Sequence, residues 1–230
     1  MTEAIKTVIF DIDNTLYDFT YSNNIALNRL REYTKENFSW TYEEFDAKHA
    51  KVQKDIYSLM GYNGVCRDRI IRYKMMMEDS SLPLYPHAVR MYELYWNTML
   101  DTLRPYDGAR EVMKAVKDMG LSVGIGTDMT VYIQMMKLER MNMFQYVDFM
   151  ITSEEAGEEK PSSAFFTMCI KKAKRSPGEC LFVGDNFSKD YVGAVSAGMK
   201  ALLFVPNGND DKIPEDVRKI YSLRQLLEYI

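Results

Sequence analysis

The chain has 230 residues, of which 47% are hydrophobic and 27% charged, and its 29 basic and 33 acidic residues give a net charge of −4. This is the composition of an ordinary globular protein, and without a strongly basic balance it argues against a nucleic-acid-binding protein. No apolar run approaches the ~18 residues of a membrane span, and the start of the chain does not resemble a signal peptide, so we expect a cytoplasmic protein with no membrane partner.

The first predicted element is a buried strand over Lys6–Asp11, which leads directly into the pair Asp11 and Asp13. Carboxylates are among the residues least often buried, and in open parallel sheets ligands bind beyond the carboxyl ends of the strands. By itself the pair has an equally good alternative, a loop that caps a helix. A calcium loop fits less well, because Leu16 stands where such a loop requires glycine.

The stretch from about Tyr17 to Leu103 breaks the strand pattern and is predicted to be helical. The predicted helices cover Ser22–Glu36, Tyr42–Leu59, Asp68–Glu78 and His87–Asp101. A helical block of this size between a first strand and the rest of a sheet is typical of an inserted domain. We therefore expect an α/β core of residues 1–16 and 104–230 and an inserted all-helical domain of residues 17–103.

Strands and helices alternate in the rest of the chain. Predicted helices follow Asp107, Thr130, Lys160 and Ser188, and predicted strands cover Leu121–Gly126, Phe149–Ser153, Cys180–Gly184 and Ala201–Val205. This alternation predicts a Rossmann-like parallel sheet with helices on both faces.

Polar residues follow each of the later strands. Thr127 ends the second strand, Lys160 precedes Pro161 at the first turn of a helix after the third, and Asp185 and Asp190 follow the fourth. Each has an ordinary alternative, as a satisfied loop hydroxyl, a surface lysine or a helix cap. Together they would gather several carboxylates at one edge of the sheet, where a lysine and a helix N-terminus favour an anion. A hard divalent cation such as Mg²⁺, which pairs with a substrate phosphate, would neutralise those carboxylates.

The order of these motifs resembles that of the haloacid dehalogenase (HAD) superfamily of phosphatases. The matching segments are Asp11-Ile12-Asp13-Asn14-Thr15, Thr127, Lys160-Pro161, and Gly184-Asp185 with Asp190. The helical block after the first motif resembles the small helical cap that the family inserts there, so the resemblance covers nearly the whole chain.

The resemblance implies a role for each acidic residue. Asp11 would be the nucleophile that forms an aspartyl-phosphate, and Asp13 would be the general acid and base. Mg²⁺ would be held by Asp11, Asp185 and the backbone carbonyl of Asp13. Asp190 would bind the ion through water or orient its neighbours.

The resemblance also assigns the phosphate site, in which Thr127 and Lys160 would hold the phosphoryl oxygens. Asp128 departs from the family, since many relatives carry Asn there. Either its charge alters phosphate affinity or its side chain points at the following helix, and we favour the second interpretation.

The expected function is hydrolysis by a Mg²⁺-dependent phosphatase of a small phosphorylated metabolite, such as a sugar phosphate or a nucleotide monophosphate. A phosphomutase is the main alternative. A non-catalytic phosphate-binding module is less favoured because clustered carboxylates cost stability, and a dehalogenase would not need Asp13 and Asp185. Substrate contacts are expected in the cap, with Tyr62, Asn63 and Arg67 as candidates and an ordinary surface turn as the alternative.

Overall fold

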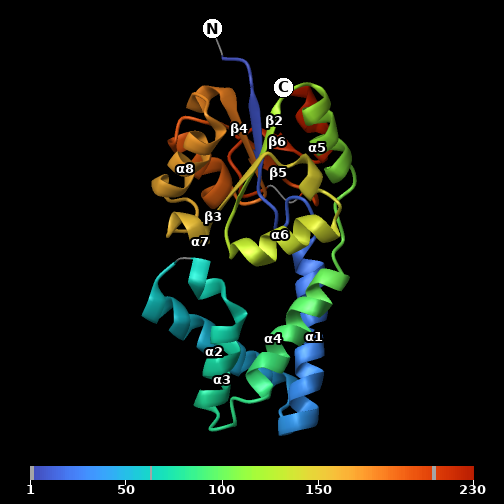
Figure 1. Ribbon diagram of the computed structural model, residues 1–230, viewed down its shortest axis with the longest axis vertical. Helices are drawn as coiled ribbons and strands as arrows, with labels where there is room; N and C mark the ends of the chain where they lie inside the picture. The colour runs from blue at the N-terminus through green and yellow to red at the C-terminus, as the bar shows by residue number, and fades with distance from the viewer. Residues whose placement is uncertain (1–2, 63, 209–210) are drawn as a thin grey trace.

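Six parallel strands form the central sheet of the protein, whose computed structural model describes residues 3–62, 64–208 and 211–230 (Figure 1). Their order across the sheet is β3-β2-β1-β4-β5-β6. The strands are β1 (Thr7–Phe10), β2 (Ser122–Thr127), β3 (Phe149–Thr152), β4 (Cys180–Gly184), β5 (Lys200–Phe204) and β6 (Lys219–Ile220). The predicted parallel sheet is confirmed, and the two-residue β6 is an addition that the sequence did not predict.

Helices cover both faces of the sheet because successive side chains of β1 point in opposite directions. Val8 and Phe10 belong to the core cluster that includes Val112 of α5, whereas Ile9 packs in a second cluster with Phe165 of α8. Figure 1 accordingly shows α5 and α8 on opposite sides of the strands. The remaining elements of this part are α5 (Ala109–Asp118), α6 (Val131–Arg140), η2 (Phe144–Tyr146), α7 (Ser153–Ala156), α8 (Ser163–Ala173), η3 (Pro177–Glu179), the π-helical turn η4 (Phe187–Tyr191), α9 (Val192–Ser196) and η5 (Leu223–Glu228).

The helical block predicted after β1 is present and lies beyond the carboxyl edge of the sheet (Figure 1). It consists of α1 (Phe19–Phe38), α2 (Tyr42–Met60), the short η1 (Gly64–Arg67), α3 (Arg69–Asp79) and α4 (His87–Asp101). The long helices α1 and α4 run side by side and connect the block to the core (Figure 1). We call this block the cap.

Two helices begin at positions other than those predicted, and in each the N-cap residue explains the difference. The first cap helix begins at Phe19, before the predicted Ser22, because the Asp18 carboxylate accepts a hydrogen bond from the Tyr21 amide at 2.8 Å. In the core, α8 begins only after Ser162, whose hydroxyl accepts from the Ala164 amide at 3.2 Å. The expectation that Pro161 lies in the first helical turn was therefore wrong, because a serine N-cap follows it.

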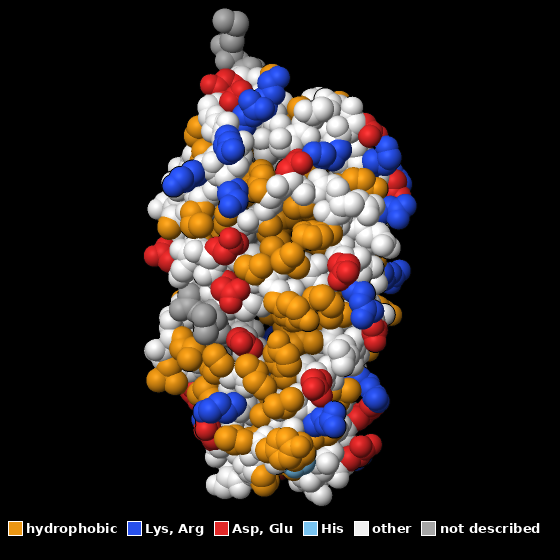
Figure 2. All heavy atoms as spheres, viewed as in Figure 1, with side chains coloured by type: hydrophobic (Ala, Val, Ile, Leu, Met, Phe, Trp, Pro, Cys, Tyr) orange, Lys and Arg blue, Asp and Glu red, His pale blue; other side chains and the backbone are white. Residues whose placement is uncertain are grey.

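The surface is consistent with the charge balance of the chain. On the face drawn in Figure 2, basic and acidic side chains are interspersed over core and cap, and apolar side chains lie between them. Among the residues that the structure describes, no helix has the length and apolar character that crossing a bilayer requires.

The half-buried His49 of the cap predicts a pH dependence of stability. Burial, together with the charge of Arg72, whose guanidinium contacts His49 Nε2 at 3.1 Å, lowers the pKa of His49 to about 3 from its ordinary 6.5. Between these values the unfolded chain binds the proton and the folded chain does not, so stability is lost as pH falls below 6.5. As pH falls below 6.5, we expect the free energy of unfolding to decrease more steeply in the wild type than in His49→Gln. The two slopes should differ by up to about 1.4 kcal/mol per pH unit. Denaturant unfolding between pH 7 and 4 measures both slopes, and parallel slopes would contradict the assignment.

Candidate active site

The strand order brings the polar residues at three strand ends together. β1 lies between β2 and β4, so Asp11, Thr127 and Asp185 leave the sheet at adjacent positions. The Asp11 amide still donates to the Val183 carbonyl at 2.9 Å, which holds the residue in line with its strand. The expectation that these residues share one edge of the sheet is confirmed.

Lys160 joins two buried carboxylates at this edge. Its Nζ lies 2.8 Å from Asp11 Oδ1 and 2.7 Å from Asp190 Oδ1, and all three side chains are less than a tenth exposed. Gly184 makes room for this arrangement, since a Cβ there would lie 2.4 Å from the Asp190 carboxyl carbon. The lysine therefore lies between the carboxylates instead of extending into solvent.

A third carboxylate completes an acidic cluster. One oxygen each from Asp11, Asp185 and Asp190 lies within 4.8 Å of the other two. Burial raises the pKa of Asp11 to about 7. The positive charge of Lys160 opposes this shift, and the negative charges of Asp190 and Asp13 add to it. Burial and the charges of Asp11 and Asp190 raise the pKa of Asp185 to about 8. One lysine thus leaves the cluster short of positive charge, and a hard divalent cation with oxygen ligands fits it.

The Asp13 side chain is directed toward a different set of partners, two residues of α6 and Tyr17. Lys137 Nζ and the Tyr17 hydroxyl both lie 2.6 Å from Asp13 Oδ1, and Gln134 Nε2 lies 3.3 Å from Oδ2. Burial opposes ionisation of this carboxyl, but Lys137, Tyr17 and Gln134 together outweigh it and lower the pKa of Asp13. Lys137 is fully buried, and the ring of Trp96 from the cap lies 5.8 Å from its ammonium group.

The sequence analysis did not identify Gln134 and Lys137 of α6, which contact Asp13 and the loop after β2. Gln134 is buried, and its amide donates to Thr127 Oγ1 at 2.7 Å and to the Asp128 carbonyl at 2.9 Å as well as to Asp13. Gln134 and Lys137 are three residues apart, and therefore share one face of the helix. Two polar residues on an otherwise buried helix face were the available signal.

Asp128 does not point along the following helix, so that expectation was wrong. Its carboxylate accepts from the Lys160 amide at 3.0 Å and from Lys189 Nζ at 2.8 Å. An acidic side chain at this position satisfies a backbone donor and a half-buried lysine. Its physical effect is to tie the loop after β2 to the loop that carries Lys160.

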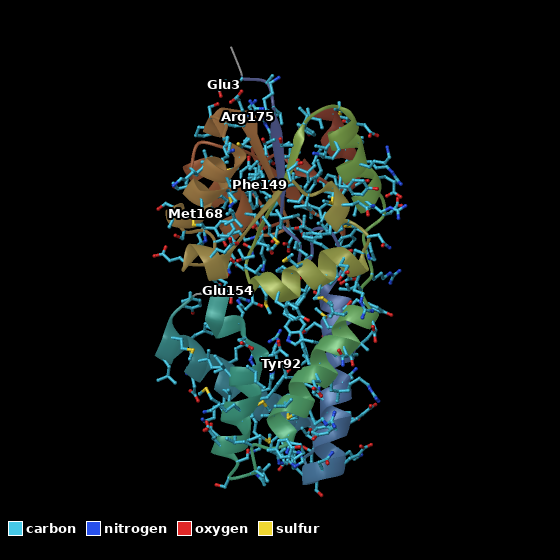
Figure 3. The ribbon with its side chains drawn as sticks, in the orientation of Figure 1. Glu3, Tyr92, Phe149, Glu154, Met168 and Arg175 are labelled. Carbon is cyan, nitrogen blue, oxygen red and sulfur yellow. The ribbon has the colours of Figure 1, made fainter. Side chains whose placement is uncertain are left out.

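A chain of ion pairs extends from this loop to the cap. The buried Glu159 accepts from Lys189 at 2.9 Å and from Arg67 of η1 at 2.6 and 2.7 Å in a bidentate pair. The cap approaches the core closely here. Gly64 permits this approach, since a Cβ at that position would lie 2.5 Å from the Glu154 amide nitrogen. Figure 3 shows Glu154 where the tip of the cap meets α7.

The three candidate substrate contacts of the cap lie in this region. Arg67 is paired with Glu159, and the Tyr62 ring is 70% exposed and stacks on Tyr57. Asn63 lies outside the described residues. Their contact with substrate stays a prediction.

Comparisons with known proteins agree with this geometry. A family model described as a haloacid dehalogenase-like hydrolase matches residues 5–198. Ribulose-1,5-bisphosphate 5-phosphatase of Halopiger xanaduensis is 29% identical over 89% of this chain and 86% of its own length. Glyceraldehyde 3-phosphate phosphatase of Methanocaldococcus jannaschii is 27% identical over 98% and 96%. The HAD-hydrolase YfnB of Bacillus subtilis, solved bound to magnesium, shares the fold with a TM-score of 0.74 and 20% identity over 98% of both chains.

Proposed function

This chain belongs to the haloacid dehalogenase-like hydrolases, and from that premise we propose that it is a Mg²⁺-dependent phosphatase that hydrolyses a small phosphorylated metabolite. The observation that carries the proposal is the buried Asp11 carboxylate, held 2.8 Å from Lys160 inside a cluster of three carboxylates. The curated relatives named above are phosphatases of small sugar phosphates, which supports a substrate of that class.

The acidic cluster supplies the ligands for the metal. Asp11, Asp185 and the backbone carbonyl of Asp13 would hold Mg²⁺, with Asp190 in contact through water or through its neighbours. When bound, the ion neutralises charge on the carboxylates and on the phosphoryl oxygens.

Asp11 acts as the nucleophile in the proposed reaction. Its carboxylate oxygen forms a bond to phosphorus while the bond to the ester oxygen breaks, and Asp13 gives its proton to the leaving alkoxide. Water then attacks the aspartyl-phosphate, Asp13 takes the proton of that water, and phosphate leaves Asp11 as a carboxylate again. Thr127 and Lys160 hold the phosphoryl oxygens in both steps.

The partners of Asp13 suit its two tasks. Lys137 and Tyr17 keep the carboxyl in one orientation and favour the ionised form, which is the form that accepts a proton from water. A phosphate ester brought next to Asp13 adds negative charge, which raises the pKa of Asp13 for the preceding protonation step.

Replacing Asp13 by Asn is expected to lower kcat/KM according to the leaving group. For an alkyl phosphate, whose alkoxide must be protonated, we expect a loss of ~10²–10⁴-fold. For p-nitrophenyl phosphate, whose phenolate leaves without a proton, the loss should be at least about 10-fold smaller, since kcat/KM reports events up to departure of the leaving group. Initial rates on both esters measure the two losses, and equal losses would exclude Asp13 as the acid.

We propose that residues 17–103 form the cap, residues 1–16 and 104–230 the catalytic core, and that the pair of Arg67 with Glu159 is a contact between them. The short distances of this pair, 2.6 and 2.7 Å, support a cap docked on the core.

Phosphate release tests the proposal directly. Purified protein is offered sugar phosphates, triose phosphates and nucleoside monophosphates, each with Mg²⁺ and with EDTA. We expect release that requires the metal. Release that persists in EDTA, or no release from any ester, would contradict a Mg²⁺-dependent phosphatase, and isomerisation of a sugar phosphate without release would indicate the phosphomutase instead.

A further inference from the structure

Four buried hydrogen-bond donors of the cap have no acceptor in the part of the chain that the structure describes. They are Arg69 Nε, Arg72 Nε, the Tyr73 hydroxyl and Trp96 Nε1. Arg72, Tyr73 and Trp96 are 2%, 0% and 4% exposed. A buried donor without an acceptor forfeits the hydrogen bonds that it makes to water. Four such donors in one small helical block point to a missing acceptor-rich ligand.

The four side chains are neighbours around Tyr95. The Arg69 guanidinium lies 4.6 Å from the centre of the Tyr95 ring and 6.0 Å from that of Trp96, and it donates to the Tyr95 hydroxyl at 2.9 Å. The Tyr73 ring centre lies 6.4 Å from that of Tyr95. Arg72 follows Arg69 by three residues and so lies on the same side of α3. We call Arg69, Arg72, Tyr73 and Trp96 the donor cluster.

The donor cluster carries positive charge that no carboxylate of the described residues balances. Neither Arg69 nor Arg72 forms an ion pair with any described residue, and the side-chain partners of their guanidinium groups are the Tyr95 hydroxyl and His49 Nε2. Burial and the nearby charge of Arg69 lower the pKa of Arg72 to about 10. The charge of the buried Arg72, next to a second cation, is unfavourable unless an anion joins them.

The donor cluster lies next to the residue that serves the leaving group. Lys137 contacts Asp13 at 2.6 Å, and its ammonium group lies 5.8 Å from the centre of the Trp96 ring. Lys137 therefore contacts Asp13 and lies close to Trp96 of the cluster. Figure 3 shows side chains in the space between α6 and the cap helices.

On the basis of the phosphatase function proposed above, we propose that the donor cluster is a subsite for a second anionic group, a carboxylate or a further phosphate, on the leaving moiety of the substrate. Asp13 protonates the ester oxygen while Arg69 and Arg72 neutralise the distal anion and Tyr73 and Trp96 donate hydrogen bonds to it. Arg67, which ends η1 two residues before Arg69, has its guanidinium occupied by Glu159, so the specificity for charge comes from α3 and α4.

Matched pairs of esters test the subsite. The carboxylate arm compares 3-phosphoglycerate with glycerol 3-phosphate, and the phosphate arm compares fructose 1,6-bisphosphate with fructose 6-phosphate. In at least one arm we expect kcat/KM for the doubly anionic ester to be about 10-fold higher or more, as a charged hydrogen bond at the distal group predicts. The arm that responds identifies the anion. No preference in either arm overturns the subsite.

Tyr73→Phe separates a ligand contact from a structural role. It removes a hydroxyl that has no partner among the described residues, so the melting temperature should stay the same or rise. If the hydroxyl binds substrate, kcat/KM for the preferred ester should fall about 5- to 10-fold while that for its singly anionic partner is retained. Arg69→Gln should lower the same ratio further, by roughly 30-fold.

Tyr33→Phe is the matched control. It also removes a cap hydroxyl, but one that is already bonded to His87 Nδ1 at 2.8 Å. It should leave the ratio between the paired esters unchanged. Equal losses on both esters of a pair in Arg69→Gln would overturn the subsite while leaving the phosphatase intact. No hydrolysis of any ester by the wild type would instead overturn the phosphatase, and the subsite with it.

Discussion

Replacing Asp11 by Asn will lower kcat/KM for every phosphate ester that the protein hydrolyses by ~10⁴-fold or more, because an amide cannot attack phosphorus and carry the phosphoryl group. The side chain keeps its size and its place after β1, where the backbone amide bonds to the Val183 carbonyl. The loss therefore reports the missing nucleophile and not a displaced strand.

The stability of Asp11→Asn should not fall with its activity. Asp11 is buried beside Asp185 and Asp190, and its pKa is raised to about 7 by burial first and by its acidic neighbours in addition. Removing one of these carboxylates relieves repulsion in the metal-free protein, although it also removes a partner of Lys160. We expect the melting temperature in EDTA to be retained or slightly raised at pH 8.

Phosphate release and thermal unfolding of one preparation measure both effects. Asp118→Asn, an identical chemical change on the exposed end of α5, controls for handling and should match the wild type in both. Activity within about 10-fold of the wild type in Asp11→Asn would rule out the covalent mechanism.

Replacing Lys160 by Met is expected to have the largest effect on stability. The ammonium group lies 2.8 Å from Asp11 and 2.7 Å from Asp190, and its side chain is 2% exposed. Removing one partner leaves buried carboxylates uncompensated, which costs ~3–5 kcal/mol in comparable buried pairs. Activity should also fall by ~10²–10³-fold, because a positive charge on the phosphoryl oxygens is lost.

The pH dependence of Lys160→Met tests this cause. Without the lysine the carboxyls bind protons more tightly in the folded chain than in the unfolded chain, so stability is lost as pH rises and recovered as pH falls. The destabilisation measured by denaturant unfolding in EDTA should therefore be greater at pH 8 than at pH 5. Combining it with Asp11→Asn should restore part of the stability and none of the activity. A variant as stable as the wild type at pH 8 would show that Lys160 does not hold the cluster together.

The sequence alone was sufficient to predict the architecture, because strands and helices are recognised from patterns of neighbouring residues. Buried parallel strands such as Cys180–Gly184 appear as short apolar runs, and the helices between them repeat with their own period. Strand ends in a parallel sheet meet at one edge, so Asp11, Thr127 and Asp185 could be grouped before their distances were known. The two-residue β6 escaped prediction because it is too short to have a period.

The tertiary structure alone decided the partners of those residues. Lys137 and Asp13 are 124 positions apart, and Glu159 and Arg67 are 92 apart. Helical periodicity shows which face of α6 or α3 is buried, but it does not show what that face meets. The polar pair Gln134 and Lys137 on a buried helix face could have been noticed in the sequence, but their contact with Asp13 could not have been predicted from it.

The sequence by itself thus determined the sheet, the inserted cap and the set of residues at the sheet edge, since each depends on neighbours within a few positions. The folded chain decided how charge is shared among them. It paired Asp13 with Lys137 and placed Lys160 between Asp11 and Asp190. Among the described residues, it left Arg69 and Arg72 without a carboxylate partner. Electrostatic energies depend on distance in space and on burial, and both are set by contacts between segments far apart in the chain.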